Sequence, residues 1–213
     1  DMNEKTLKPE IRYKGFTNAW EQSKLEEIMD TVTDYVAAGS FADLATNVKY
    51  NSNMDYAQLV RTTDLKNKFT NNGFVYVDKN AFDILYRVIL NTETIVLPNI
   101  GNCGEVYYVN PSVLPHKNNV LGPNAILVRS SKHDNSFFSY NFLTENFYNR
   151  LMLIVSPTGQ SKFNKTELKD LNVEYPKIEE QVKLGKLFRN IDQLITLHQR
   201  KHYYPKLDNN LIT

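Results

Sequence analysis

The sequence predicts an α+β fold: a globular domain of short mixed β-strands and helices, followed by a long C-terminal α-helix that forms a coiled coil. Short apolar runs of strand-like composition mix with helical stripes up to residue 175, the pattern of an α+β domain. The 213 residues, 41% hydrophobic and 23% charged, suffice for one sizeable core. From Leu184 to Ile195, apolar residues recur at heptad spacing.

The first part of the chain contains few periodic segments. Residues 11–16 are predicted to be extended. Trp20 is predicted to lie in a short helical stretch, with Leu25 and Ile28 on the same face, and to anchor the core. Residues 32–77 are interpreted as polar and irregular, with only short apolar runs.

The middle of the chain predicts a hairpin, a strand and a helix. Residues 92–98 indicate a strand that ends in a loop at residues 99–104 and returns at residues 105–109. Another strand is expected at residues 125–128. One helix is expected over residues 141–153, where apolar side chains fall on a helical stripe. A polar loop, residues 156–165, then precedes a short helix at residues 166–171.

The terminal helix is predicted from about Glu179 to Tyr204, with Pro205 ending it because proline lacks a backbone donor. Such a helix would be about 40 Å long and needs a surface that covers its apolar stripe. Either a partner helix or the chain's own globular domain would cover it. The stripe consists of Leu184, Leu187, Phe188, Ile191, Leu194 and Ile195.

Composition limits the compartment and the partners. Cys103 is the single cysteine, which excludes an intrachain disulfide and suits a reducing compartment. The sequence has no run of about eighteen apolar residues, so a cytoplasmic protein without membrane contact is expected. The net charge of +1 argues by itself for neither nucleic acid nor membrane. Any DNA footprint must therefore be local.

Two specific motifs, near the two ends of the chain, resemble the specificity subunit of type I restriction-modification enzymes. Residues 9–16, followed by Trp20-Glu21-Gln22 and residues 24–28, resemble the segment that opens one half of such a subunit. Residues 101–109 and 156–171 are similar to weaker motifs of its target recognition domain. A second set of residues resembles the segment that ends one half of such a subunit: Pro176, Glu180-Gln181, Gly185, Phe188, Ile191-Asp192 and residues 197–201.

The resemblance implies a noncatalytic DNA sequence-recognition subunit without a cofactor of its own. It would read one half of a split site on double-stranded DNA and direct adenine methylation or cleavage by methylation (M) and restriction (R) subunits. Those partners would use S-adenosylmethionine, ATP and Mg. Family members usually carry two recognition domains and two helical regions, whereas this chain has one of each.

This difference predicts a homodimer, or association with a second half-subunit, through the terminal helix. The expected division is a DNA-binding domain at residues 1–175, a helix for spacing, dimerisation and docking of the methylation subunit at residues 176–205, and a tail at residues 206–213.

Candidate DNA contacts are polar and cationic side chains of the predicted loops, since base edges need donors and acceptors and phosphates need cations. The loop at residues 156–165 is the first choice. The other candidates come from three further loops and from the end of the strand near residue 128. The full set is Lys49, Asn51, Arg61, Thr62, Asn99, Asn102, Arg129, Lys132, Thr158, Gln160, Ser161, Lys162, Asn164 and Lys165.

No catalytic or metal-binding residues are assigned from the sequence. The chain contains neither the Asn/Asp-Pro-Pro-aromatic motif of a DNA methyltransferase nor a phosphate-binding Gly-Lys-Ser/Thr loop. His198 and His202 stand four residues apart but are interpreted as solvated or interface residues. Two alternatives stay open: a stand-alone hydrolase or nuclease that uses Glu105, His116 or His133, and a protein-interaction adaptor without a nucleic-acid role.

Overall fold

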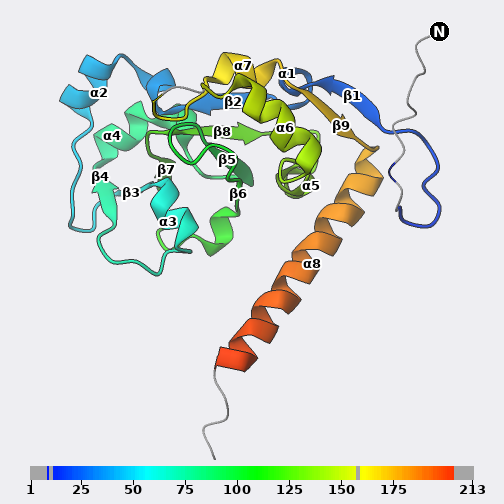
Figure 1. Cartoon of the computed structure of the whole chain (residues 1–213). Helices are drawn as coiled ribbons and strands as arrows, with labels where there is room; N and C mark the ends of the chain where they lie inside the picture. The colour runs from blue at the N-terminus through cyan, green and yellow to red at the C-terminus, as the bar shows by residue number, and fades with distance from the viewer. Residues whose placement is uncertain (1–8, 10–11, 157–158, 204–213) are drawn as a thin grey trace, which may run out of the picture.

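The computed structural model describes residue 9, residues 12–156 and residues 159–203 (Figure 1). It has the α+β architecture that the sequence predicts, with short strands and helices in a globular part and one long helix at the C-terminal end. Residues 11–16 were predicted to be extended. Ile11 lies outside the described residues, and for the residues after it the prediction is wrong. Phe16 N donates to Tyr13 O at 3.2 Å and closes a turn there.

A four-stranded antiparallel sheet forms the centre of the globular part. Its strands are β2 (Thr31–Asp34), β8 (Ala125–Arg129), β5 (Thr94–Pro98) and β6 (Tyr107–Val109), in that order. Thr94 pairs with Val109 and Pro98 pairs with Ala125. The predicted hairpin and the predicted strand near residue 128 are therefore confirmed.

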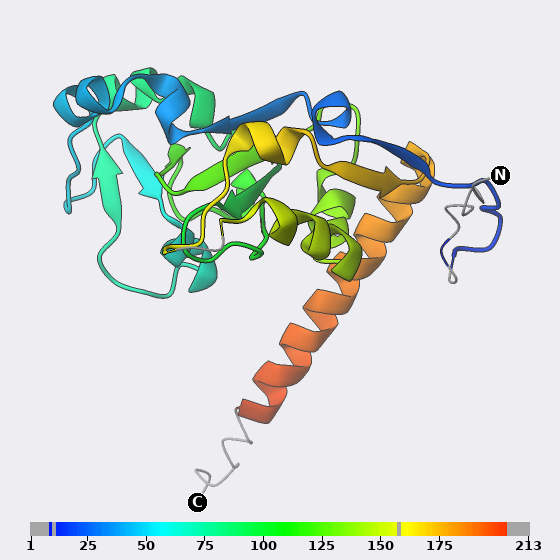
Figure 2. The ribbon, with the colours of Figure 1, turned by 45° about the horizontal axis from the view of Figure 1, so that its top comes forward.

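Two smaller sheets flank the central one. Strands β4 (Val75–Val77), β3 (Ala57–Val60) and β7 (Asn119–Leu121) form the first, with β3 and β7 parallel. Strands β1 (Glu21–Lys24) and β9 (Asn172–Tyr175) form the second and join the two ends of the globular part (Figure 2).

The irregular interpretation of residues 32–77 is wrong. Besides β3, β4 and most of β2, this stretch forms the 3-10 helix η1 (Tyr35–Ala38), α2 (Phe41–Asn47) and α3 (Thr62–Lys66). Ser40 caps α2 by accepting a hydrogen bond from Asp43 N at 3.1 Å. Elements this short carry less than two periods of a helical pattern, so periodicity did not reveal them.

The predicted helix over residues 141–153 is two helices. Helix α5 (Asn135–Asn141) ends where that prediction begins, and α6 (Glu145–Ile154) follows. Thr144 separates them because its hydroxyl accepts from Phe147 N and caps α6. The globular part also contains the short helices α1 (Leu25–Ile28), α4 (Lys79–Ile84), η2 (Tyr86–Val88) and η3 (Pro111–Val113).

The central sheet separates two hydrophobic clusters. Val96 and Leu127 belong to the first cluster, which lies between this sheet and the β4-β3-β7 sheet. Ile95 and Ile126 belong to the second, which contains α5, α6 and β9 side chains. Alternate side chains of one strand point to opposite faces, so β5 and β8 contribute to both clusters.

Trp20 packs against the second cluster, although the helical stretch predicted around it is wrong. It precedes β1, is partly buried, and meets Phe137 edge to face at a ring distance of 5.8 Å. The short helix predicted at residues 166–171 is present as α7 (Lys165–Lys169), which begins one residue earlier and ends two residues earlier than predicted.

The long terminal helix is confirmed as α8 (Ile178–Tyr203). Its first turns pack on α5, and the rest projects away from the globular part (Figure 2). Pro205 lies outside the described residues. The coiled coil stays a prediction.

Candidate functional site

Two loops that the sequence analysis singled out separately lie side by side. Ile100 and Lys162 form an antiparallel bridge. Gly101 N donates to Ser161 O at 2.8 Å, and Phe163 N donates to Asn99 O at 3.1 Å. We call residues 99–104 and 159–164 the paired loops. Their backbone pairing presents two polar segments as one surface.

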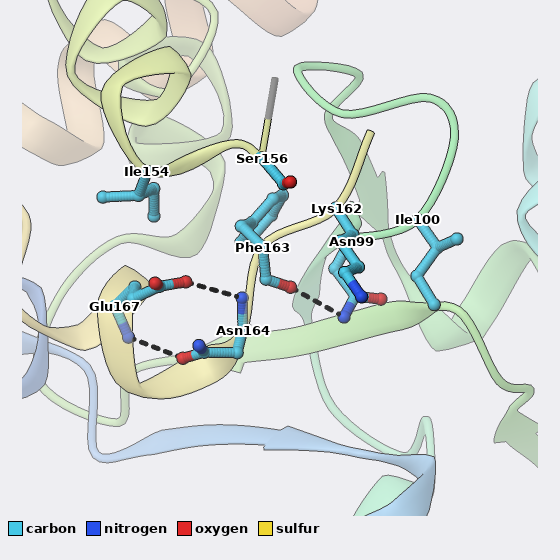
Figure 3. A pocket seen from close by; sticks show the side chains of 8 residues that line it. All are labelled: Asn99, Ile100, Ile154, Ser156, Lys162, Phe163, Asn164 and Glu167. Atoms are coloured by element: carbon cyan, nitrogen blue, oxygen red, sulfur yellow. Dashed lines mark hydrogen bonds between the residues drawn. The ribbon is translucent and has the colours of Figure 1, made fainter. Parts of the chain in front are cut away.

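A pocket opens where the paired loops meet α6 and α7 (Figure 3). Asn99 links the two loops at the pocket, because its Nδ2 donates a hydrogen bond to Phe163 O at 3.1 Å. The Asn99 Oδ1 atom is buried and has no hydrogen-bond partner among the described residues. It is therefore an unsatisfied acceptor on a residue that lines the pocket. Eight residues line the pocket: Asn99, Ile100, Ile154, Ser156, Lys162, Phe163, Asn164 and Glu167.

The tips of the paired loops carry exposed polar side chains. Asn102, Gln160, Ser161 and Lys162 are all exposed. The side chains of Asn102 and Gln160 form no hydrogen bond with a described residue, so their amide groups are available to a ligand. Gly101 has a φ of +86°, a backbone conformation that glycine tolerates best.

Two residues of the predicted loop are engaged in other contacts. Asn164 caps α7, because its Oδ1 accepts from Glu167 N at 2.9 Å. Lys165 pairs with Asp34 Oδ1 at 2.8 Å. Thr158 lies outside the described residues.

Arg61 has a structural role near the start of α3. Its Nε and Nη2 donate to both oxygens of Asp64, at 3.0 and 2.8 Å, and Nη2 also donates to Gly73 O at 2.9 Å. Asp64 is completely buried, and its carboxylate pKa is lowered because hydrogen bonds from Arg61 and Asn71 outweigh the cost of burial. Thr62 is the first residue of α3.

Lys49 and Asn51 lie beside the β4-β3-β7 sheet rather than with the paired loops. Lys49 Nζ donates to Ala45 O at 2.7 Å. The backbone of Asn51 bridges to Tyr76 in β4, and its side chain bonds Asn53 and Asp55.

Arg129 and Lys165 line a second cleft, although the sequence analysis placed Arg129 at the end of a predicted strand and Lys165 in the loop at residues 156–165. Arg129 Nη1 donates to Thr92 Oγ1 at 3.0 Å and to Asn91 Oδ1 at 3.2 Å. Arg87 and Lys169 line the same cleft and were missed. The i,i+4 spacing of Lys165 and Lys169 was a usable signal, whereas no local pattern marks Arg87. Lys132 is exposed just beyond the end of β8.

The groups considered for hydrolysis have separate partners. Glu105 binds Lys66 Nζ and the Tyr107 hydroxyl; these hydrogen bonds outweigh desolvation by burial and lower its carboxylate pKa. His116 bonds the backbone of Asn118 and packs against Tyr76, whereas His133 bonds Gln181. The described residues contain no group of three or more His, Cys, Asp or Glu side chains that could hold a metal.

Cys103 has the wrong environment for a nucleophile. It is half-buried against the second hydrophobic cluster. Burial raises the pKa of its thiol, which disfavours the reactive thiolate.

The first half of α8 is anchored to the globular part. Gln181 is completely buried: its Nε2 donates to Pro176 O at 2.8 Å and its Oε1 accepts from Asp134 N at 3.1 Å. At Gly185, a Cβ atom would lie 2.6 Å from Asp134 Oδ1 and 2.9 Å from Phe137 N. Only glycine therefore allows α8 to approach α5 this closely.

The anchoring contacts continue to Asp192. Phe188 packs against Tyr140 at a ring distance of 5.2 Å, and the Tyr140 hydroxyl donates to Asp192 Oδ2 at 2.7 Å. Arg189 reaches the hydroxyl of Tyr108 on β6 at 3.3 Å.

Most of the predicted apolar stripe of α8 is exposed. Leu194 is 65% exposed and Leu197 is 53% exposed, unusually high values for leucine. Leu184 packs against the second hydrophobic cluster and Phe188 packs against Tyr140, so this end of the stripe contacts the chain's own domain. The exposed members are Leu187, Phe188, Ile191, Leu194 and Ile195. None of the described helices is long and apolar enough to span a membrane.

Comparison with known proteins places this architecture among DNA specificity proteins. Residues 18–203 match the family described as "Type I restriction modification DNA specificity domain". A putative type I restriction enzyme MjaX specificity subunit of Methanocaldococcus jannaschii is 25% identical over 187 residues, which cover 83% of this chain and 40% of that protein. The chain thus spans less than half the length of this curated relative.

Two solved structures share the fold at low sequence identity. The S subunit of a type I restriction-modification system from M. genitalium has a TM-score of 0.56 and 14% identity, over 87% of this chain and 42% of that one. The HsdS subunit of Thermoanaerobacter tengcongensis has a TM-score of 0.56 and 12% identity, over 92% of this chain and 43% of that one.

Proposed function

The chain belongs to the type I restriction modification DNA specificity domain family, and from this premise we propose that it is a noncatalytic DNA sequence-recognition subunit. It reads one half of a split site and directs adenine methylation or cleavage by partner subunits. The observation that carries the proposal is the family match over residues 18–203, which includes both the globular part and α8. The globular part is then the DNA-binding domain and α8 the spacer.

The paired loops are our choice for the surface that reads base edges. Asn and Gln amides carry both a donor and an acceptor and form bidentate pairs with adenine. Asn102 and Gln160 present such amides at exposed loop tips. Lys162, exposed beside them, supplies a cation for a neighbouring phosphate. Arg61 and Asn164 are weaker candidates because both side chains already have partners within the chain.

The exposed part of α8 is our choice for the surface that binds protein partners. Methylation subunits, and a second copy or second half-subunit, would cover Leu187, Ile191, Leu194 and Ile195. Restriction subunits would join through that assembly. Linking two recognition modules raises affinity without new base contacts, which a chain of net charge +1 needs.

Co-expression with the matching methylation subunit, followed by mapping of the methylated sequence, tests this function. We expect methylation at a split site for the wild type. Asn102→Ala and Gln160→Ala should each relax the sequence preference by about ten- to a hundredfold, since a bidentate base contact contributes about 1–3 kcal/mol. Thermal stability should not change, because both side chains are exposed.

Asn80→Ala is the matched control, since Asn80 is an exposed amide on α4 away from the paired loops. Methylation without sequence preference by the wild-type complex would contradict the proposed function. Divalent-metal-dependent DNA cleavage by the pure chain would support the nuclease alternative instead.

A further inference from the structure

A basic cleft lies at the free edge of the central sheet. Strand β2 is the outermost strand of that sheet among the described residues, and the cleft runs along it between η2 and α7. Four cations line it: Arg87 from η2, Arg129 from β8, and Lys165 and Lys169 from α7. We call these four residues the basic cleft.

The basic cleft concentrates positive charge in a nearly neutral chain. Of the carboxylates, Asp30 lines the cleft and Asp34 pairs with Lys165. Four cations against these two anions leave a local charge of +2, which exceeds the net charge of +1 of the whole chain. An uncompensated cluster of this kind attracts an anion.

Three of the four cations form no ion pair with a described carboxylate. Arg129 bonds only neutral acceptors, Thr92 Oγ1, Asn91 Oδ1 and Ile89 O. The guanidinium of Arg87 lies 5.1 Å from the centre of the Tyr86 ring, and no carboxylate of the described residues pairs with it or with Lys169. The hydroxyls of Thr31 and Thr33 add neutral donors to the same cleft.

Helix α7 separates the basic cleft from the pocket of the paired loops. Lys165 and Lys169 are four residues apart and share one face of α7, whereas Glu167 lines the pocket. A helix with its side chains is about 10–12 Å across. The major groove is about 12 Å wide, so the phosphates that flank it lie within about that distance of a side chain that reads bases inside the groove.

We propose that the basic cleft binds a phosphodiester group of the DNA backbone, beside the groove that the paired loops read. This inference rests on the proposed function and assigns phosphate-binding roles to Arg87 and Lys169. Because the contact is to the backbone, it contributes affinity and register but no sequence preference.

The test is the salt dependence of binding by the full chain, alone and with its methylation subunits. The probes are a random-sequence duplex and a duplex that carries the mapped site. In Arg87→Gln/Lys169→Gln, the slope of log K against log salt should shrink in magnitude by about 0.9, since one phosphate contact contributes about 0.9. The ratio of site-specific to random-sequence affinity should stay unchanged. Arg129 is left intact because it also holds Asn91 and Thr92.

Lys79→Gln/Lys177→Gln is the matched control, because it removes two exposed cations that pair with Asp83 and Glu21 outside the cleft. A slope equal to that of this control would overturn the phosphate site, as would absence of salt-dependent binding by the wild type. A reduced slope in Arg87→Gln/Lys169→Gln, together with a wild-type complex that shows no sequence preference, would support the basic cleft and contradict the proposed function.

Discussion

His133 and Gln181 form a partly buried contact that joins the loop before α5 to the start of α8. Gln181 Nε2 lies 3.0 Å from His133 Nδ1, and the imidazole packs edge to face against Phe138 and Tyr175. Nε2 is a donor, so Nδ1 must be an unprotonated acceptor in this arrangement. Burial lowers the pKa of His133, although the negative charge of Glu21 opposes the shift. The contact therefore requires a neutral imidazole.

This contact predicts a pH dependence of stability. The pKa of the histidine is about 6.5 in the unfolded chain and is lower in the folded protein. The unfolded state therefore binds more protons at pH values between the two pKa values. The stabilisation is complete above the unfolded pKa and is lost as pH falls through that window. Urea unfolding should show a steeper loss of free energy between about pH 8 and pH 5 in the wild type than in His133→Phe.

The phenylalanine keeps the ring packing and removes the titrating group, so only the pH slope is compared. Equal slopes in the two proteins would contradict a lowered histidine pKa.

At the scale of the element, α8 is two segments in one continuous helix. Up to Asp192 its contacts with α5 and β6 fix its direction relative to the globular part. Beyond that residue the helix projects away from the domain (Figure 1), and its apolar side chains Leu194, Ile195 and Leu197 are exposed. Exposed apolar residues at heptad spacing are typical of a helix that packs against another chain. The anchored segment would thus set the orientation of whatever partner binds the other.

Leu194→Asp tests the partner-binding segment. Burial of an unpaired carboxylate costs several kcal/mol, so self-association should weaken by about a hundredfold or more. Light scattering over a range of concentrations measures this, and co-purification measures binding of the methylation subunit. Gln193→Asp is the matched control, because it adds the same charge at the adjacent exposed position. Two results together would contradict the role of this segment: the wild type stays monomeric, and it binds the methylation subunit no more tightly than Leu194→Asp does.

At the scale of the whole molecule, the central sheet couples two hydrophobic clusters. Strands β5 and β8 place alternate residues in each cluster, so neither cluster is complete without the sheet. The pairing of β1 with β9 closes the structure by joining its two ends. This arrangement favours cooperative unfolding of the whole globular part.

Leu127→Ala tests this coupling. Leu127 is completely buried in the first cluster, so its truncation should cost about 2–5 kcal/mol. Trp20, the single tryptophan, reports on the second cluster by fluorescence, and its transition should shift together with the far-UV circular dichroism transition. Leu153→Ala is the control, because Leu153 is 86% exposed and its truncation should change stability by less than about 0.5 kcal/mol. An unshifted Trp20 transition would indicate two independent folding units.

The sequence by itself determined the family, the α+β class, the β5-β6 hairpin and α8, because these rest on local spacing and specific motifs. Glu180-Gln181 and Gly185 were recognisable as a pattern, and their close contacts explain why those residue types are needed. The short elements between β2 and β4 were missed, and so was the break at Thr144, because one capping hydrogen bond overrides an apolar stripe.

Only the tertiary structure decided which polar residues share a surface. The bridge between Ile100 and Lys162 brings the paired loops together, and α7 carries Lys165 and Lys169 to the same cleft as Arg87. It also engages Arg61 with the backbone carbonyl of Gly73, although the sequence offers Arg61 as readily as any exposed cation. The physical reason is that contacts between distant segments depend on sheet pairing and core packing, which the spacing of residues along the chain does not encode.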